Sequence, residues 1–150
     1  MGKCMSCCSP SNKSNYTFLN GDYYIGQTNN NLPNGKGKKF TSKGTLIYEG
    51  DFVNGCFQGQ GKMYYSSGKI QYDGHFANGK YDGFGTFFWE NGEYYVGEML
   101  NGLKHGKGEI FYSNGVSKIK GNFVNDNYVG EVIDNDIYLV MDIHAPKNNN

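Results

Sequence analysis

The chain has 150 residues, of which 23 are glycine, 13 tyrosine and 10 phenylalanine; this composition indicates one domain of many short strands joined by tight turns. Its formal net charge is zero, but residues 1–47 carry +5 and residues 48–150 carry −5, and every basic residue is a lysine. Without arginine we expect no sequence-specific nucleic-acid binding, because such recognition relies on the bidentate guanidinium group. No run of about 20 apolar residues could form a spanning helix, and no apolar segment follows Met1, so we expect a cytosolic protein with reduced cysteines.

Residues 1–15 are predicted to be a disordered, acylated segment and linker. Gly2, with serine in the sixth position, fits the N-myristoylation pattern, and Cys4, Cys7 and Cys8 are typical palmitoylation sites beside a myristoylated glycine. One myristoyl chain binds a membrane with an association constant of only about 10⁴ per molar, so stable attachment needs the second signal. The alternatives are a tail with incidental cysteines and a zinc site, for which a downstream Cys-x-x-Cys pair is missing.

The rest of the chain repeats itself every 23 or 24 residues. A Tyr-x-Gly pattern, weaker in its last copy, ends at Gly26, Gly50, Gly74, Gly97 and Gly121. A Gly-x-Gly pattern keeps the same step at Gly35/Gly37, Gly59/Gly61, Gly83/Gly85 and Gly106/Gly108. A third glycine column stands at Gly44, Gly68, Gly92 and Gly115. Three columns that share one period identify a repeat protein, whose fold is that of the repeated unit.

Each unit is predicted to be two short antiparallel strands and two turns. Tyr48, Gly50 and Phe52 alternate with acidic residues, as expected for a strand. Asn54 and Gly55 follow, a dipeptide typical of two-residue hairpin turns, and Asn-Gly recurs in register in later units. The sequence therefore predicts an all-β fold: an elongated, single-layer antiparallel meander of stacked hairpins.

Glycine in a strand interior is unfavourable unless the backbone bends or another group approaches it closely. Because the Tyr-x-Gly glycines share a face with the aromatic residues, we expect rings to lie flat on bare glycine backbone. A single-layer sheet of short hairpins cannot cover both faces, so we also expect part of this aromatic face to stay accessible and to bind a partner. The predicted partner-binding residues are Tyr48, Phe52, Tyr65, Tyr72, Phe76, Trp89, Tyr95 and Tyr112.

The repeat domain is predicted to span residues 16–133, with four good repeats between partial end repeats. No glycine follows Gly130, and residues 137–143 form an apolar run interrupted only by Asp142. We assign residues 134–150 to a C-terminal cap and tail, in which this run is a closing strand or a segment folded across the sheet.

Residues 72–79 and 83–92 carry the pattern Tyr-x-Gly-x-Phe-x-Asn-Gly, then Gly-x-Gly, an aromatic strand and a glycine turn. This pattern resembles the MORN repeat (membrane occupation and recognition nexus) and covers residues 16 to about 133. Ile119 in place of tyrosine and Thr28 in place of phenylalanine depart from it. The resemblance implies a scaffold, dimerisation module, partner-docking surface or lipid binder, often at a cortical membrane and its cytoskeleton.

Enzymatic chemistry is not expected. The stretch from Gly74 to Lys80 imitates a phosphate-binding loop, but Tyr81 stands where serine or threonine should bind magnesium. His75 and His105 stand in polar columns of the repeat, and Cys56 lies after a turn with no base at a useful spacing. We predict no catalytic residue, cofactor, metal or small-molecule substrate.

Two functions remain. In the first, the chain is a non-catalytic scaffold, attached by myristoyl and palmitoyl groups to the cytoplasmic face of the plasma membrane or a cortical inner membrane. It would dock a protein partner or form a homodimer there. In the second, the sheet itself binds an anionic lipid head group, a phosphoinositide or phosphatidic acid, through Lys36, Lys38, Lys39 and Lys43. We favour the scaffold, because lysines clustered in one repeat are more often a solvated face.

Overall fold

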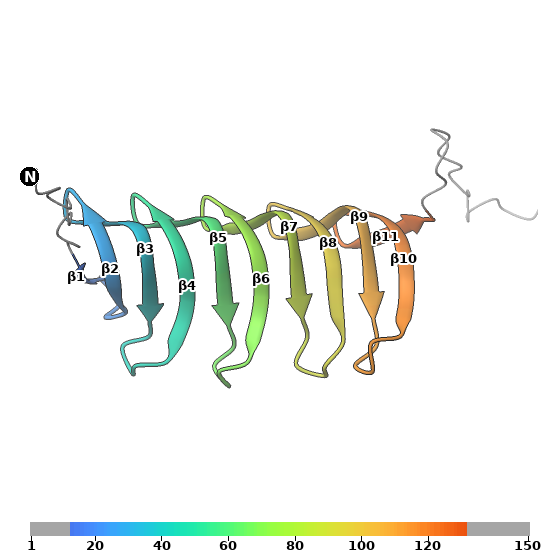
Figure 1. The fold of residues 1–150 in the computed structure, drawn as a ribbon, viewed down its shortest axis with the longest axis horizontal. Helices are drawn as coiled ribbons and strands as arrows, with labels where there is room; N and C mark the ends of the chain where they lie inside the picture. The colour runs from blue at the N-terminus through green and yellow to red at the C-terminus, as the bar shows by residue number, and fades with distance from the viewer. Residues whose placement is uncertain (1–12, 132–150) are drawn as a thin grey trace, which may run out of the picture.

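The computed structural model describes residues 13–131, which form one open sheet of eleven strands. The strands are β1 Lys13–Thr17, β2 Tyr23–Asn29, β3 Leu32–Phe40, β4 Leu46–Val53, β5 Cys56–Tyr64, β6 Ile70–Ala77, β7 Lys80–Phe88, β8 Tyr94–Leu100, β9 Leu103–Phe111, β10 Ser117–Val124 and β11 Asn127–Gly130. Sheet order equals chain order, and neighbouring strands are antiparallel (Figure 1). The predicted all-β, single-layer meander is confirmed, and the strands line up into an elongated ribbon with β1 and β11 at its ends.

The N-terminal strand begins earlier than predicted. β1 starts at Lys13, whereas residues 13–15 were assigned to the linker and the domain boundary to residue 16. Ser14 pairs with Gly26 and Asn15 with Ile25. Backbone ladder bonds do not depend on the polarity of the side chains, which is why this polar stretch does not look like a strand in the sequence. The acylation sites and residues 132–150 lie outside the described residues.

The two edges of the ribbon carry different turns, which alternate along the chain. On one edge are two-residue turns such as Asn54-Gly55, whose φ angles are 49° and 83°. Both angles are positive, as a type I′ hairpin requires, so the turns predicted at Asn-Gly are confirmed. Asn30 and Asn31 make the same turn without glycine, with φ angles of 49° and 62°. Asparagine tolerates this backbone region, and this turn was not predicted from the sequence.

A row of glycines crosses the sheet directly from strand to strand. Its paired members are Gly26, Gly37, Gly50, Gly61, Gly74, Gly85, Gly97, Gly108 and Gly121. The rings of Tyr24, Tyr48, Tyr72 and Tyr95 lie against this row, so a Cβ at Gly85 would stand 2.5 Å from Cζ of Tyr72. The predicted contact between tyrosine rings and bare glycine backbone is confirmed.

Each tyrosine hydroxyl reaches the strand backbone beyond the glycine that its ring covers. Tyr48 donates to the carbonyl of Asp51 at 2.9 Å, and Tyr72 donates to the carbonyl of His75 at 3.1 Å. A buried hydroxyl needs such an acceptor. The column therefore holds tyrosine, whose hydroxyl provides this bond, where phenylalanine would only fill the space.

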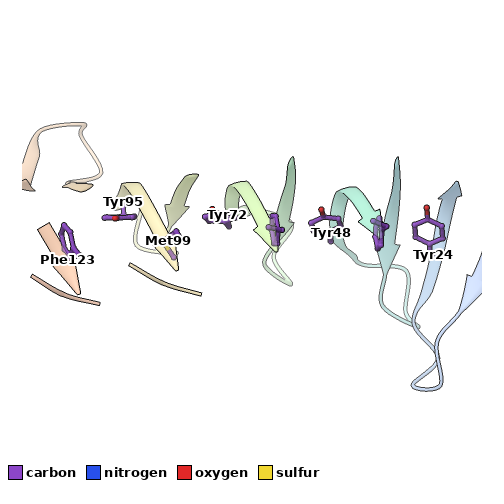
Figure 2. Close-up of a cluster of buried hydrophobic side chains, with 8 residues drawn as sticks. Tyr24, Tyr48, Tyr72, Tyr95, Met99 and Phe123 are labelled. Carbon is purple, nitrogen blue, oxygen red and sulfur yellow. The ribbon is translucent and has the colours of Figure 1, made fainter. Parts of the chain in front are cut away.

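The aromatic face is the core of the protein, which contradicts its predicted accessibility. Figure 2 shows the tyrosines in line from one repeat to the next. Of the predicted partner-binding residues, five are at most 1% exposed, namely Tyr48, Phe52, Tyr72, Phe76 and Tyr95. The cause is packing between repeats: Tyr48 meets Phe76 of the next repeat edge to face at 5.0 Å and stacks on Phe57 at 3.9 Å. These rings cover one another, so this face needs no second layer.

Candidate functional site

The opposite side of the sheet, here called the ladder face, carries charged side chains that pair across strands. Its central row consists of Ile25, Lys38, Glu49, Lys62, Asp73, Thr86, Val96, Glu109 and Lys120, each paired with the next. Lys38 lies 2.7 Å from Glu49, and Lys62 lies 2.9 Å from Asp73. Opposite charges facing each other on one sheet face stabilise the register.

The four lysines predicted to contact lipid do not form a cationic cluster. Lys36 and Lys38 are on the ladder face, and Lys36 pairs with Asp51 at 2.8 Å. Lys39 is on the aromatic face, where it lies 3.3 Å from Asp22, and Lys43 is in an exposed turn. Consecutive strand residues point to opposite faces, so adjacent lysines in the sequence separate in the fold.

Three of these lysines, Lys36, Lys38 and Lys39, form ion pairs with carboxylates. Hydrogen bonds from the Lys38 ammonium and the Tyr64 hydroxyl lower the pKa of Glu49. Glu49 is therefore ionised at neutral pH and offsets the charge of Lys38. The shallow depression over β2 to β6 of the ladder face contains both signs of charge, which gives little preference for an anionic ligand.

Three of the predicted partner-binding residues remain accessible. Tyr65, Trp89 and Tyr112 open successive turns on one edge of the ribbon, in the same column as Phe18. We call these four residues the aromatic rim. Tyr112 is 45% exposed and the other three are partly exposed. Since each repeat adds two strands, Tyr65, Trp89 and Tyr112 follow one another at about 10 Å. Thr41 opens the turn between Phe18 and Tyr65.

Local contacts hold the aromatic rim in place. The Tyr65 hydroxyl donates to the carbonyl of Phe88 at 2.8 Å, and Trp89 meets Phe87 at 5.4 Å. The ammonium of Lys118 lies 5.0 Å from the centre of the Tyr112 ring. Side chains fixed before binding lose less conformational entropy when a partner arrives, which favours a docking role.

The exposed aromatic residues Phe84 and Tyr128 were not predicted from the sequence. Phe84 on the ladder face is 63% exposed, although its counterparts in the other repeats are Lys36, Gln60 and Lys107. It lines a second depression, over β7 to β10, together with Tyr94, Val96, Lys107, Gly108, Glu109, Phe111 and Lys120. A comparison of the middle residues of the Gly-x-Gly patterns, which point away from the aromatic face, would have revealed Phe84.

The described residues offer little catalytic chemistry. Burial raises the pKa of Tyr72 and of Tyr81 to about 12, so both hydroxyls stay protonated at neutral pH. Among residues 13–131 no three His, Cys, Asp or Glu side chains are grouped to hold a metal ion. Over the same range we find no helix with the length and hydropathy that crossing a bilayer requires.

The family model of the MORN repeat matches residues 24–45, 48–70, 72–94 and 95–117, more than half of the chain. The chain belongs to the MORN-repeat family. Each matched MORN repeat begins at a buried tyrosine of the core, so the family pattern and the tyrosine–glycine contacts describe the same residues. The match is to MORN repeats alone, which are typically non-catalytic, and no catalytic domain is found. No curated protein matches this MORN-repeat chain.

Proposed function

We propose that this MORN-repeat protein is a non-catalytic, membrane-anchored scaffold. Its aromatic rim docks a protein partner or a second copy at the cytoplasmic face of the plasma membrane, or of a cortical inner membrane with its cytoskeleton. The observation that carries the proposal is the accessible column Tyr65, Trp89 and Tyr112 on a ribbon whose repeat tyrosines Tyr24, Tyr48, Tyr72 and Tyr95 are buried. A row of fixed aromatic side chains is typical of a binding surface.

The place of the N-terminal strand supports the anchoring role. β1 forms one end of the ribbon (Figure 1), and the chain reaches it directly from the segment with the proposed acylation sites, Gly2, Cys4, Cys7 and Cys8. An anchor there holds the ribbon by one end and leaves the repeats free to project from the membrane. Partners bound at successive rim positions would then stand at different distances from the bilayer.

Replacing the two tyrosines of the aromatic rim tests the docking surface. In the variant Tyr65→Ser with Tyr112→Ser, we expect proteins that copurify with the acylated chain to be lost by roughly tenfold or more, because interface aromatics carry much of the binding energy. The measurement is quantitative affinity purification from the cells that produce the protein. The control, Val129→Ser, changes an exposed residue of β11 away from the rim and should keep the partners. Equal recovery of partners with the unchanged protein, the double variant and the control would show that the aromatic rim is not the docking surface.

The alternative function, anionic-lipid binding by the sheet, is tested with unacylated protein. Because three of the four candidate lysines are ion-paired, we expect no measurable binding to vesicles containing a phosphoinositide or phosphatidic acid at physiological salt. Vesicle sedimentation is the measurement. Clear binding that disappears in the variant Lys36→Gln with Lys38→Gln would instead establish the lipid function.

A further inference from the structure

The row of charged residues on the ladder face is interrupted at β7 and β8. In its central row Thr86 and Val96 are paired, so the charged ladder is interrupted for two strands. Phe84 stands two residues from Thr86 on the same face and exposes 63% of its surface. With Tyr94 and Phe111, which stack at 4.8 Å, it makes an apolar hollow on the ladder face. Exposure of such an apolar surface to water is unfavourable, so the hollow favours the binding of another apolar group.

The border of this hollow carries two exposed lysines, Lys107 and Lys120, beside Glu109 on the side toward the end of the sheet. Lys120 exposes 74% of its side chain, and its nearest carboxylate oxygen, on Glu109, is 3.6 Å away. Lys107, on the neighbouring strand, is also exposed and lines the same hollow. Both ammonium groups can therefore accept an additional acidic neighbour next to the apolar surface.

The sequence after β11 has the complementary chemistry. Between positions 131 and 142 it contains four acids and no base: Glu131, Asp134, Asp136 and Asp142. Residues 137–143 read Ile-Tyr-Leu-Val-Met-Asp-Ile, an apolar run that needs to be covered. The aromatic face of the sheet cannot cover this apolar run, because Phe123 and Tyr95 on that face are already buried by their own neighbours.

The length of the connection fits the hollow. Gly130 pairs with Asn122, so the chain leaves the sheet beside the middle of β10 and close to Lys120. Three strand spacings, from β11 back to β8, amount to roughly 14 Å. Residues 132–136, when extended, can span up to about 17 Å. Residue 137 can therefore arrive over β8, and the apolar run can follow over Phe84.

We propose that residues 137–143 of this chain occupy the Phe84 hollow, with the acids of the preceding segment beside Lys120 and Lys107. The segment then shields this apolar hollow, and a partner that binds there must displace it. The proposal concerns the ladder face and does not depend on the aromatic rim or on membrane attachment. A second copy or another protein as the occupant are the alternative outcomes of its test.

Photo-crosslinking in the full-length protein tests the contact. The change Tyr138→benzoylphenylalanine places a photoreactive ring within the proposed segment. After irradiation at low protein concentration, we expect crosslinks within one chain, joining the segment to peptides that contain Phe84, Val96 or Phe111. Mass spectrometry of the digested monomer band locates them. The same group in place of Asn149, outside the segment, should give no such crosslink.

A substitution on the sheet gives the decisive comparison. Phe84→Lys restores the residue type of Lys36 in the same column, so the exposed position should tolerate it without loss of fold. We expect it to lower the crosslink yield roughly tenfold, the factor that corresponds to about 1.4 kcal/mol for a phenyl contact. The matched change Gln60→Lys, in the same column of the preceding repeat, should leave the yield unchanged. Crosslinks between chains, crosslinks to the rim, or a yield insensitive to Phe84→Lys would each overturn the proposal.

Discussion

Gly85→Ala is expected to destabilise the protein by about 2–4 kcal/mol, a large share of the stability of a typical domain. A Cβ at Gly85 would stand 2.5 Å from Cζ and 2.8 Å from Cε2 of Tyr72, whose ring is fully buried. The ring cannot move aside without losing its hydrogen bond to the carbonyl of His75. Since each repeat contacts only its neighbours, the damage separates the ribbon between β6 and β7. Urea unfolding followed by circular dichroism measures the loss.

Two further variants separate this steric effect from a general effect of losing glycine. Gly68→Ala adds a Cβ that meets nothing within 4 Å, at a residue with φ +83°. It should cost only the backbone strain of about 1 kcal/mol. In a Tyr72→Leu background, where the flat ring is gone, Gly85→Ala should lose most of its effect. An equal cost in both backgrounds would show that the ring does not need the bare backbone.

Gly2→Ala is expected to release the protein from membranes almost completely. Under the proposed anchoring, myristate on Gly2 provides the first, weak contact, with an association constant of about 10⁴ per molar, and brings the cysteines to the bilayer for palmitoylation. Without myristate neither step occurs, because palmitoylation follows only once the first contact has brought the cysteines to the bilayer. The measurement is fractionation of cells that produce the full-length chain, with metabolic labelling by myristate and palmitate analogues.

The three cysteines provide the matched comparison. Replacing Cys4, Cys7 and Cys8 together by serine should keep the myristoyl label but leave weak attachment that exchanges between membranes. A Gly2→Ala protein that stays in the membrane fraction would remove the acylation proposal. Membrane attachment would then depend on a partner or on lipid binding by the sheet, the alternative function.

Most of the fold could be predicted from local signals. The turn at Asn54-Gly55 and the contact of Tyr48 with Gly50 and Gly61 follow from turn chemistry and two-residue alternation, which are properties of a short stretch of chain. The turn at Asn30 and Asn31 and the early start of β1 could not be predicted in this way. Their residues are polar, and only pairing with the neighbouring strand makes them regular.

The accessible surface could be predicted only in part. Tyr65, Trp89 and Tyr112 remain reachable, whereas Tyr48 and Phe76, which look the same in the sequence, are buried against each other across the repeat boundary. The exposure of Phe84 follows from its place beside Gly85, on the side opposite the ring-covered face, which two-residue alternation in the sequence could have shown.

The sequence by itself determined the repeat, its hairpins and the pairing of tyrosine with glycine, because these depend on residues within one unit. Only the tertiary structure decided which aromatic rings form the core, and that Lys36, Lys38 and Lys39 meet carboxylates on opposite faces. Burial and charge pairing in this protein depend on contacts between neighbouring strands and between successive repeats, and those contacts exist only after the hairpins stack.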